Sequence, residues 1–295
     1  MILLTGGTGQ VGCSILAKVQ AHHGPFFAPA RMELDLSDPQ SIQRVLESRD
    51  WTAIINAGAY TAVDQAESEP LLAEAINSNA PAILARFCQK HAIPLIHFST
   101  DYVFAGDVSS PYYEDADTAP LGVYGKSKLA GEQAIFASND RAMILRTSWV
   151  VSPYGKNFIK TMLRLAQDRD EIRVVADQYG CPTGAQDLAS VVLSILPRLM
   201  SDQNAPTGIY HCCNQGETTW AGLARMVIEA SAGLGGPKAR IIDISTADYP
   251  TSAQRPHYSR LSCDRLQKDW EITLRAWQPM VADIVAALLH EKETV

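Results

Sequence analysis

A glycine-rich loop between an apolar run and a helical pattern opens this chain. The run Ile2–Thr5 predicts a buried strand, Gly6–Gly12 is the loop, and Ser14–Val19 predicts a helix. Strand, glycine-rich turn and helix are together the setting of a dinucleotide fingerprint, in which a pyrophosphate meets backbone N–H groups at a helix N-terminus. The spacing is G-x-x-G-x-x-G rather than the commoner G-x-G-x-x-G. A Walker-type phosphate loop is excluded, because no Gly-Lys-Ser/Thr follows.

Short apolar runs alternate with helical patterns through the first half of the chain. We expect strands at Ile2–Thr5, Pro25–Ala28, Ala53–Ala57, Pro94–Ser99 and Ala142–Trp149. We expect helices from the N-cap signal Ser37–Pro39 to about Arg49, from Pro70 to about His91, and from Gly122 to Ala137. This alternation predicts an α/β fold with a Rossmann-type, doubly wound parallel sheet. Ligands of such sheets bind at the carboxyl ends of the strands.

The second half of the chain is less regular. Loops rich in Pro, Gly and Tyr separate amphipathic helices expected near Ala185–Met200, Trp220–Ala232 and Trp277–His290. We therefore expect residues 1–150 to form a dinucleotide-binding domain and residues 151–295 to form mainly a smaller substrate-binding domain. One strand near residues 207–212 is expected to return to the main sheet.

Composition limits the classes of partner and compartment. The net charge of −7 over 295 residues argues against a nucleic-acid partner, which favours a basic face. The six cysteines form no C-x-x-C pair, so they indicate neither a zinc site nor a redox motif. The first strand starts almost at Met1, which leaves no room for a signal peptide, and no apolar run is long enough to span a bilayer. We therefore expect a cytoplasmic protein with no membrane partner.

Tyr124 and Lys128 stand four residues apart within the predicted helix from Gly122 to Ala137. This spacing places both side chains on one helix face. A nearby ammonium favours the phenolate and would lower the pKa of Tyr124 toward the working pH of an acid/base catalyst. Such pairs are also common on solvated helix faces. The catalytic interpretation of the pair is favoured here because the same chain begins with the glycine-rich loop.

Further motifs extend over nearly the whole chain. They are Gly6–Gly12, Asn56–Asp64, Ser99–Phe104, Val123–Glu132, Arg146–Trp149, Asn157–Leu163, Asp177–Thr183, Arg255–Pro256 and Ser259–Leu261. Through them the chain resembles the extended short-chain dehydrogenase/reductases, and within these the enzymes that reduce a 4-keto-6-deoxy sugar nucleotide. The resemblance implies NADPH- or NADH-dependent reduction of the C4 ketone of dTDP-4-dehydro-L-rhamnose to dTDP-L-rhamnose, for rhamnose-containing cell-surface polysaccharide.

The resemblance also implies a role for each site residue. Tyr124 would protonate the C4 oxygen of the substrate, Thr100 would hydrogen-bond the same oxygen, and Lys128 would hold the nicotinamide ribose. The implied cofactor-binding residues are Gly6, Gly9, Gln10, Val11, Gly12, Arg31, Asp35, Leu36, Ala59, Tyr60, Thr61, Ser99, Tyr124 and Lys128. The implied substrate-binding residues are Thr100, Asp101, Tyr124, Trp149, Asn157, Thr183, Arg255 and Arg260, the two arginines being candidates for the diphosphate.

Several of these residues have alternative interpretations. For Thr100 the alternative is a purely structural role, as the cap of a local turn. Trp149 could instead pack in the core between the two halves. Arg260 could instead pair with a surface carboxylate. Asp101 is followed by Tyr102 rather than by the second acid of the sugar-nucleotide dehydratases, which favours simple reduction over water elimination. Arg31 stands where a Rossmann acid would bind a ribose hydroxyl, so it is either a contact for a 2′-phosphate or a lone surface arginine.

Metal binding and oligomeric state form a separate question. Some relatives bridge a dimer with magnesium held by acidic side chains, but the positions that correspond here are Ser14 and Gln186. A hard cation prefers carboxylate oxygens. We therefore expect no metal, and a homodimer stays open.

Two rival functions stay open on the sequence. A sugar-nucleotide epimerase would share Thr100, Tyr124 and Lys128 but would retain tightly bound NAD through its cycle. A non-catalytic regulatory subunit can use the same fold, although a retired site has no need for all three residues.

Overall fold

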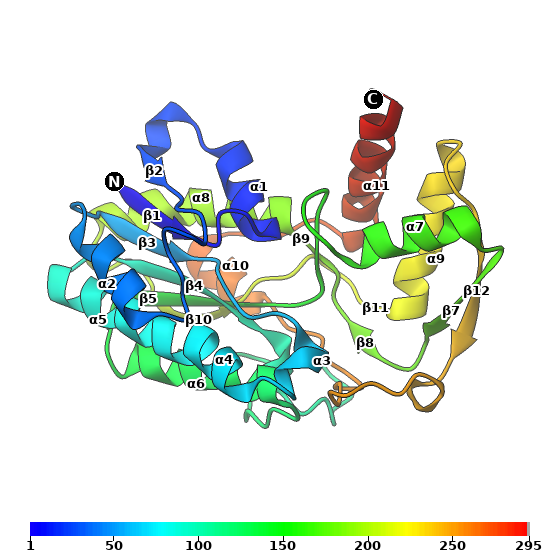
Figure 1. Ribbon diagram of the computed structural model, residues 1–295, viewed down its shortest axis with the longest axis horizontal. Coiled ribbons are helices and arrows are strands. Elements are labelled where there is room, and N and C mark those ends of the chain that lie inside the picture. The colour runs from blue at the N-terminus through cyan, green and yellow to red at the C-terminus, as the bar shows by residue number, and fades with distance from the viewer. Residues whose placement is uncertain (294–295) are drawn as a thin grey trace.

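A six-stranded parallel sheet forms the larger lobe of the molecule (Figure 1), in the order β10-β5-β4-β3-β1-β2. Its strands are β1 (Ile2–Thr5), β2 (Phe26–Phe27), β3 (Ala53–Asn56), β4 (Leu95–Thr100), β5 (Ala142–Thr147) and β10 (Gly208–His211). Every neighbouring pair in the sheet is parallel. The structure, a computed structural model, describes residues 1–293. The predicted α/β fold with a Rossmann-type parallel sheet is confirmed.

Alternating side chains cover the two faces of this sheet because successive residues of a strand point to opposite sides. Leu4, Ile55 and Leu145 face α1 (Gln10–Lys18) and α8 (Ala185–Ser201). Leu3, Ile54 and Ile144 face the opposite layer. That layer consists of α2 (Pro39–Glu47), α5 (Ala80–His91) and α6 (Val123–Phe136). Both faces are buried, so the strands consist mostly of apolar residues.

The helix expected from Pro70 to His91 is interrupted. It consists of α4 (Pro70–Glu74), the π-helical turn η2 (Ala75–Asn79) and α5. Gly131 of α6 lies against this turn so closely that a Cβ atom there would stand 2.1 Å from the carbonyl oxygen of Asn77. The side chain of Asn77 accepts a hydrogen bond from the backbone N–H of Tyr60 at 2.8 Å. The turn therefore ties the segment after β3 to α6.

A second core builds the smaller lobe. Helices α7 (Phe158–Asp168), α9 (Trp220–Gly233) and α11 (Trp277–Glu293) pack there with β7 (Glu171–Val175) and β12 (Arg240–Ile244). The strands β7 and β12 form a parallel pair. Between the two visits of the chain to this lobe, α8 and β10 belong to the larger lobe. The division of the chain at residue 150 stays a prediction.

The remaining elements are short. They are β6 (Val150–Val151) paired with β9 (Thr183–Gly184), β8 (Tyr179–Gly180) paired with β11 (Thr218–Thr219), the helices α3 (Val63–Ala66) and α10 (Asp264–Trp270), and the 3-10 turns η1 (Ala21–His23), η3 (Asp101–Val103) and η4 (Thr246–Asp248). Among residues 1–293, no helix combines the length and the apolar character that crossing a membrane requires.

Some expected boundaries are wrong. The strand expected to reach Trp149 ends at Thr147, because Trp149 adopts a positive φ of 47°. The strand expected at Pro25–Ala28 covers only Phe26–Phe27. The N-cap signal Ser37–Pro39 is confirmed: Asp38 caps α2, since its side chain accepts from the backbone N–H of Gln40. The elements α7, β7 and β12 were not expected from the sequence.

Candidate active site

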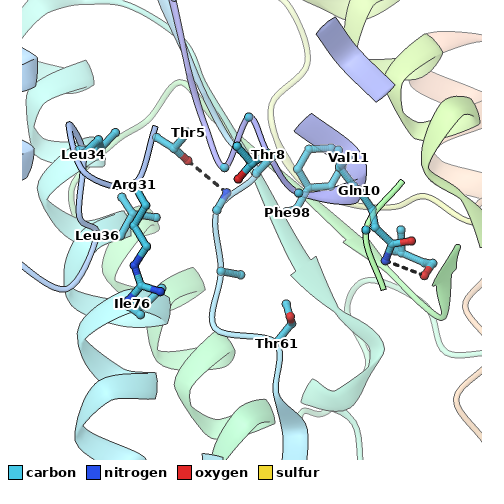
Figure 2. A pocket seen from close by; sticks show the side chains of 18 of the residues that line it. Thr5, Thr8, Gln10, Val11, Arg31, Leu34, Leu36, Thr61, Ile76 and Phe98 are labelled. Atoms are coloured by element: carbon cyan, nitrogen blue, oxygen red, sulfur yellow. Dashed lines mark hydrogen bonds between the residues drawn. The ribbon is translucent and has the colours of Figure 1, made fainter. Parts of the chain in front are cut away.

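A cavity of about 530 Å³ opens at the carboxyl ends of the central strands. Figure 2 shows Arg31 and Leu36 on one side of it and Gln10 and Val11 on the other. Of the expected cofactor-binding residues, those that line it are Gly6, Gly9, Gln10, Val11, Arg31, Asp35, Leu36, Ala59, Thr61, Ser99, Tyr124 and Lys128. Its volume is that of an ordinary cofactor or ligand site.

Two expected cofactor residues do not line this cavity. A Cβ atom on Gly12 would stand 2.2 Å from the carbonyl oxygen of Gly6, so Gly12 permits the close packing of the loop on its helix. The phenol of Tyr60 turns to Glu69 and donates a hydrogen bond to its carboxylate at 2.8 Å.

The glycine-rich loop fits the phosphates of a dinucleotide. Gly6 has a φ of +67°, and a Cβ atom there would stand 2.5 Å from the backbone nitrogen of Gly58. Helix α1 begins just after Gly9, and no side chain caps its first N–H groups. Its first turn carries no acidic residue. Free N–H groups and the positive end of the helix dipole therefore meet at the cavity.

Tyr124 and Lys128 both lie on α6 beside the end of β4. Lys128 Nζ donates a hydrogen bond to the carbonyl oxygen of Phe98 at 2.6 Å and lies 3.2 Å from His97 Nε2. Burial lowers the pKa of Lys128 to about 8. Burial also raises the pKa of Tyr124 to about 12, against the opposing effect of the neighbouring Thr100 hydroxyl. The predicted lowering of the Tyr124 pKa by Lys128 is therefore wrong, because loss of solvent is the largest influence on this pKa and the opposing hydrogen bond comes from Thr100.

Thr100 is the last residue of β4, and the capping contact considered for it is present, while its catalytic role stays a prediction. Its hydroxyl accepts a hydrogen bond from the backbone N–H of Tyr102 at 3.2 Å, which caps the turn η3. It also donates to Asp101 Oδ1 at 3.1 Å. Asp101 is buried, and burial raises the pKa of this carboxyl to about 7 although hydrogen bonds oppose the shift. Tyr102 meets Tyr124 edge to face, with ring centroids 5.7 Å apart. Thr100, Asp101 and Tyr124 therefore form one cluster.

Trp149 stacks on Trp220 of α9, with ring centroids 3.6 Å apart and planes inclined by 9°. A Cβ atom on Gly180 would stand 2.6 Å from its indole Cε2 atom. Trp149 packs against the core of the smaller lobe while staying partly exposed. These contacts agree with both interpretations of Trp149, as a wall of the substrate pocket and as a residue of the core.

The structure does not bring Asn157 and Thr183 into an open substrate pocket. Asn157 caps α7 and donates a hydrogen bond to Gln10 Oε1 at 3.0 Å, so it supports the glycine-rich loop from the other lobe. Thr183 is fully buried, and its hydroxyl donates to the carbonyl oxygen of Cys181 at 3.2 Å.

Both candidate arginines for the diphosphate pair with carboxylates. Arg255 makes a two-pronged contact with Asp64, at 2.6 and 3.1 Å. Arg260 lies 3.2 Å from Glu217 and lines a second cavity of about 310 Å³. The pairing considered for Arg260 is therefore present in the structure, and Arg255 is paired in the same way.

The chain matches a known family over nearly its whole length. The RmlD substrate binding domain family matches residues 1–290. The chain belongs to this family.

Members and solved relatives of the RmlD family cover the chain almost completely. The dTDP-4-dehydrorhamnose reductase of Sinorhizobium fredii is 41% identical over 291 residues, which are 98% of each chain. The Escherichia coli K12 protein of the same name is also 41% identical, over 94% of each chain. A crystal structure of the Bacillus anthracis reductase in complex with NADP matches with a TM-score of 0.89 and 32% identity, covering 97% of this chain and 98% of that one.

Several buried polar residues of this RmlD-family chain were not expected from the sequence. Arg146 of β5 pairs with Glu132 of α6 at 2.6 Å, and the Ser99 hydroxyl donates to the same carboxylate at 2.5 Å. Ser99 lines the cavity, but its hydroxyl is engaged away from it. Asn56 and His97 lie within the sheet. The sequence feature that could have revealed them is a polar residue inside an apolar strand, because a buried polar side chain is uncommon without a hydrogen-bond partner.

Proposed function

We propose that this protein is a dTDP-4-dehydrorhamnose reductase, which uses NADPH or NADH to reduce the C4 ketone of dTDP-4-dehydro-L-rhamnose to dTDP-L-rhamnose, for rhamnose-containing cell-surface polysaccharide. The observation that carries the proposal is that Tyr124 and Lys128 line a glycine-rich cavity, with the Thr100 hydroxyl beside Tyr124. The names of the relatives support the substrate.

Each of three residues of the chain has a separate role in the reduction of a ketone. The reduced nicotinamide, when bound, supplies a hydride to the ketone carbon. Tyr124 keeps its proton at neutral pH, because burial holds its pKa at about 12, and gives that proton to the C4 oxygen as negative charge develops there. Thr100, whose hydroxyl donates to Asp101 in the structure, would turn that hydrogen to the same oxygen. Lys128 has one N–H left after Phe98 and His97, and this N–H is available to the ribose.

Absorbance of the reduced nicotinamide tests the proposal directly. Purified protein should oxidise NADPH or NADH only after dTDP-4-dehydro-L-rhamnose is added, with dTDP-L-rhamnose as the product. An epimerase would instead carry NAD through purification and show no net oxidation. A regulatory subunit would bind the cofactor without turnover. No substrate-dependent loss of absorbance with either cofactor contradicts the assignment.

The expectations about compartment, assembly and metal stay predictions. We expect a cytoplasmic enzyme, and sedimentation of the purified protein distinguishes a monomer from a homodimer. Among the side chains that the structure describes, no three of His, Cys, Asp or Glu gather as a metal ion would need. Full activity after dialysis against a chelator is the expected result.

A further inference from the structure

A chain of four buried side chains runs beneath the cofactor cavity. Thr5 Oγ1 lies 2.5 Å from Asn56 Oδ1, Asn56 Nδ2 lies 2.9 Å from His97 Nδ1, and His97 Nε2 lies 3.2 Å from Lys128 Nζ. None of the four is more than 2% exposed. Thr5 and Lys128, the two ends, both line the cavity. The register of the sheet produces this proximity, because Thr5 of β1 pairs with Asn56 of β3, and Asn56 pairs with His97 of β4.

The hydrogen bonds of this chain have a direction. An amide nitrogen only donates, so Asn56 Nδ2 donates to His97 Nδ1 and the ring hydrogen must stand on Nε2. That N–H points to Lys128 Nζ, which accepts it only as a neutral amine. At the other end the Thr5 hydroxyl donates to Asn56 Oδ1 and accepts from the backbone N–H of Gly58 at 3.1 Å. This arrangement satisfies every member of the chain with Lys128 uncharged.

Rotation of the Asn56 side-chain amide by half a turn gives a second arrangement in which every group of the chain again has a hydrogen-bond partner. Its oxygen then accepts from His97 Nδ1–H, and His97 Nε2 accepts from the Lys128 ammonium. The amide nitrogen now donates to Thr5 Oγ1, which also accepts from Gly58. The Thr5 hydroxyl hydrogen is thereby released toward the cavity. The two arrangements differ in the charge of Lys128 and in the direction of the Thr5 hydroxyl.

The charged groups around Lys128 leave both of its forms accessible. Burial lowers the Lys128 pKa to about 8, while Glu132, on the same helix, opposes that shift. Arg146 from β5 pairs with Glu132 and limits this effect. Tyr124 keeps its proton in this range. His97 stays neutral, since burial and the charge of Lys128 hold its pKa well below the ordinary value.

We propose that Asn56 and His97 are positioning residues that couple the charge of Lys128 to the Thr5 hydroxyl at the cavity wall. The ammonium form of Lys128 accompanies a Thr5 hydroxyl free to donate into the cavity, so a dinucleotide that accepts this hydrogen bond favours the charged lysine. The inference rests on the proposed function for the identity of that ligand. The arrangement of the four side chains does not depend on it.

Nitrogen NMR of histidine-labelled protein tests the coupling without any sugar nucleotide. The seven histidines include His97, whose signals are identified by their loss in His97→Gln. Its ring should carry the hydrogen on Nδ1 at acidic pH and on Nε2 at alkaline pH, with the change centred on the Lys128 titration near pH 8. His211 is an internal control, because its Nδ1 faces the carbonyl oxygen of Ser262 at 3.1 Å and must donate at every pH.

Asn56→Asp sharpens the test, because a carboxylate can only accept from His97 Nδ1–H. This variant should move the midpoint of the tautomer change upward by at least about one pH unit, a tenfold change in proton affinity. The matched control is Asn139→Asp, a buried amide at the opposite end of the sheet, just before β5, whose Oδ1 accepts from the backbone N–H of Arg141. It should leave the midpoint in place.

NADPH supplies the second readout. Adding it to the wild-type protein should raise the midpoint of the His97 change, and its affinity should fall above that midpoint. A single His97 tautomer from about pH 6 to about pH 10 in the wild-type protein overturns the proposal, even if Asn56→Asp fails to fold. Failure of the reductase assay with an intact tautomer change would overturn only the assigned substrate.

Discussion

Loss of solvent decides the protonation of single residues at this site. It raises the pKa of Tyr124 to about 12 and of Asp101 to about 7, and it lowers that of Lys128 to about 8. Each shift favours the neutral form of the group. The residue expected to act as an acid therefore holds its proton at neutral pH, with no need for the depressed pKa that the Tyr124–Lys128 spacing predicts.

Tyr124→Phe tests the acid role. The variant should retain its affinity for NADPH, because only a hydroxyl is lost, and its turnover should fall at least about 10²-fold, the usual contribution of a positioned acid. Stopped-flow absorbance gives the turnover, and fluorescence titration gives the Kd. Turnover close to that of the wild type would remove Tyr124 from this role.

Asp101→Asn tests the burial of a carboxyl. The folded pKa of about 7 lies above the ordinary value of 3.8, so the stability that this group contributes is complete below pH 3.8 and is lost as pH rises through about 7. The variant removes this titration. Its melting temperature relative to the wild type should therefore increase from about pH 5 to about pH 8, by the equivalent of a few kcal/mol at most. The exposed Asp117→Asn is the control, and an unchanged difference for Asp101→Asn would contradict the shift.

Arg31 lines the cavity on the same side as Leu36 (Figure 2), where the sequence places no Rossmann acid. If it meets a 2′-phosphate, Arg31→Ala should weaken NADPH more than NADH, by roughly 1.5–3 kcal/mol for a charge-assisted contact. Parallel titrations with the two cofactors measure the difference. Equal losses would return Arg31 to the surface-residue interpretation.

At the scale of elements, the turn after β5 and the strand β8 hold Trp149 between them. Trp149 has a positive φ of 47°, and its ring covers Gly180. No larger residue fits at position 180 without moving the ring. The pairing of Trp149 with Trp220 thus depends on one small residue in a two-residue strand.

Gly180→Ala tests what Trp149 does. A Cβ atom 2.6 Å from the indole must displace the ring, so KM for the sugar nucleotide should rise several-fold while NADPH affinity stays unchanged. Gly233→Ala in α9 is the matched control, since a Cβ atom there meets nothing within 4 Å. A lowered melting temperature with an unchanged KM would show that Trp149 is structural only.

The sequence allowed some elements to be predicted better than others. Apolar runs such as Ala53–Asn56 in the sheet were clear because a parallel strand is buried on both faces; here Ile54 and Ile55 carry that signal. The pairing of β7 with β12 was not clear from the sequence, because these two strands lie far apart in the chain. Tyr124 and Lys128 were found because helical spacing is local. Asn56 and His97 were missed because strand register, which brings them together, cannot be read from spacing.

At the scale of the whole molecule, the chain passes from the larger lobe to the smaller lobe and back more than once. The sheet needs β10, and α8 covers the face that carries Leu4 and Ile55. Both come after the first visit of the chain to the smaller lobe. The ion pair between Asp64 and Arg255 joins segments from the two halves of the sequence.

A fragment of residues 1–150 tests the predicted division of the chain. It lacks β10 and α8, so it would expose the apolar face that Leu188, Val192 and Ile195 cover in the full chain. We expect it to aggregate or to unfold without a cooperative transition. Circular dichroism during heating, with the full chain as the control, measures this. A sharp transition near that of the full chain would support an autonomous first domain.

The stacked indoles of Trp149 and Trp220 also have an optical consequence. Two indole rings this close couple through their electronic transitions, so the circular dichroism of their indole bands should differ from that of two isolated tryptophans. Any ligand that slides between the rings or turns one of them would collapse this signal. The molecule therefore carries its own spectroscopic reporter at the place where the sugar is expected to bind, and arrival of the sugar could be timed without a label.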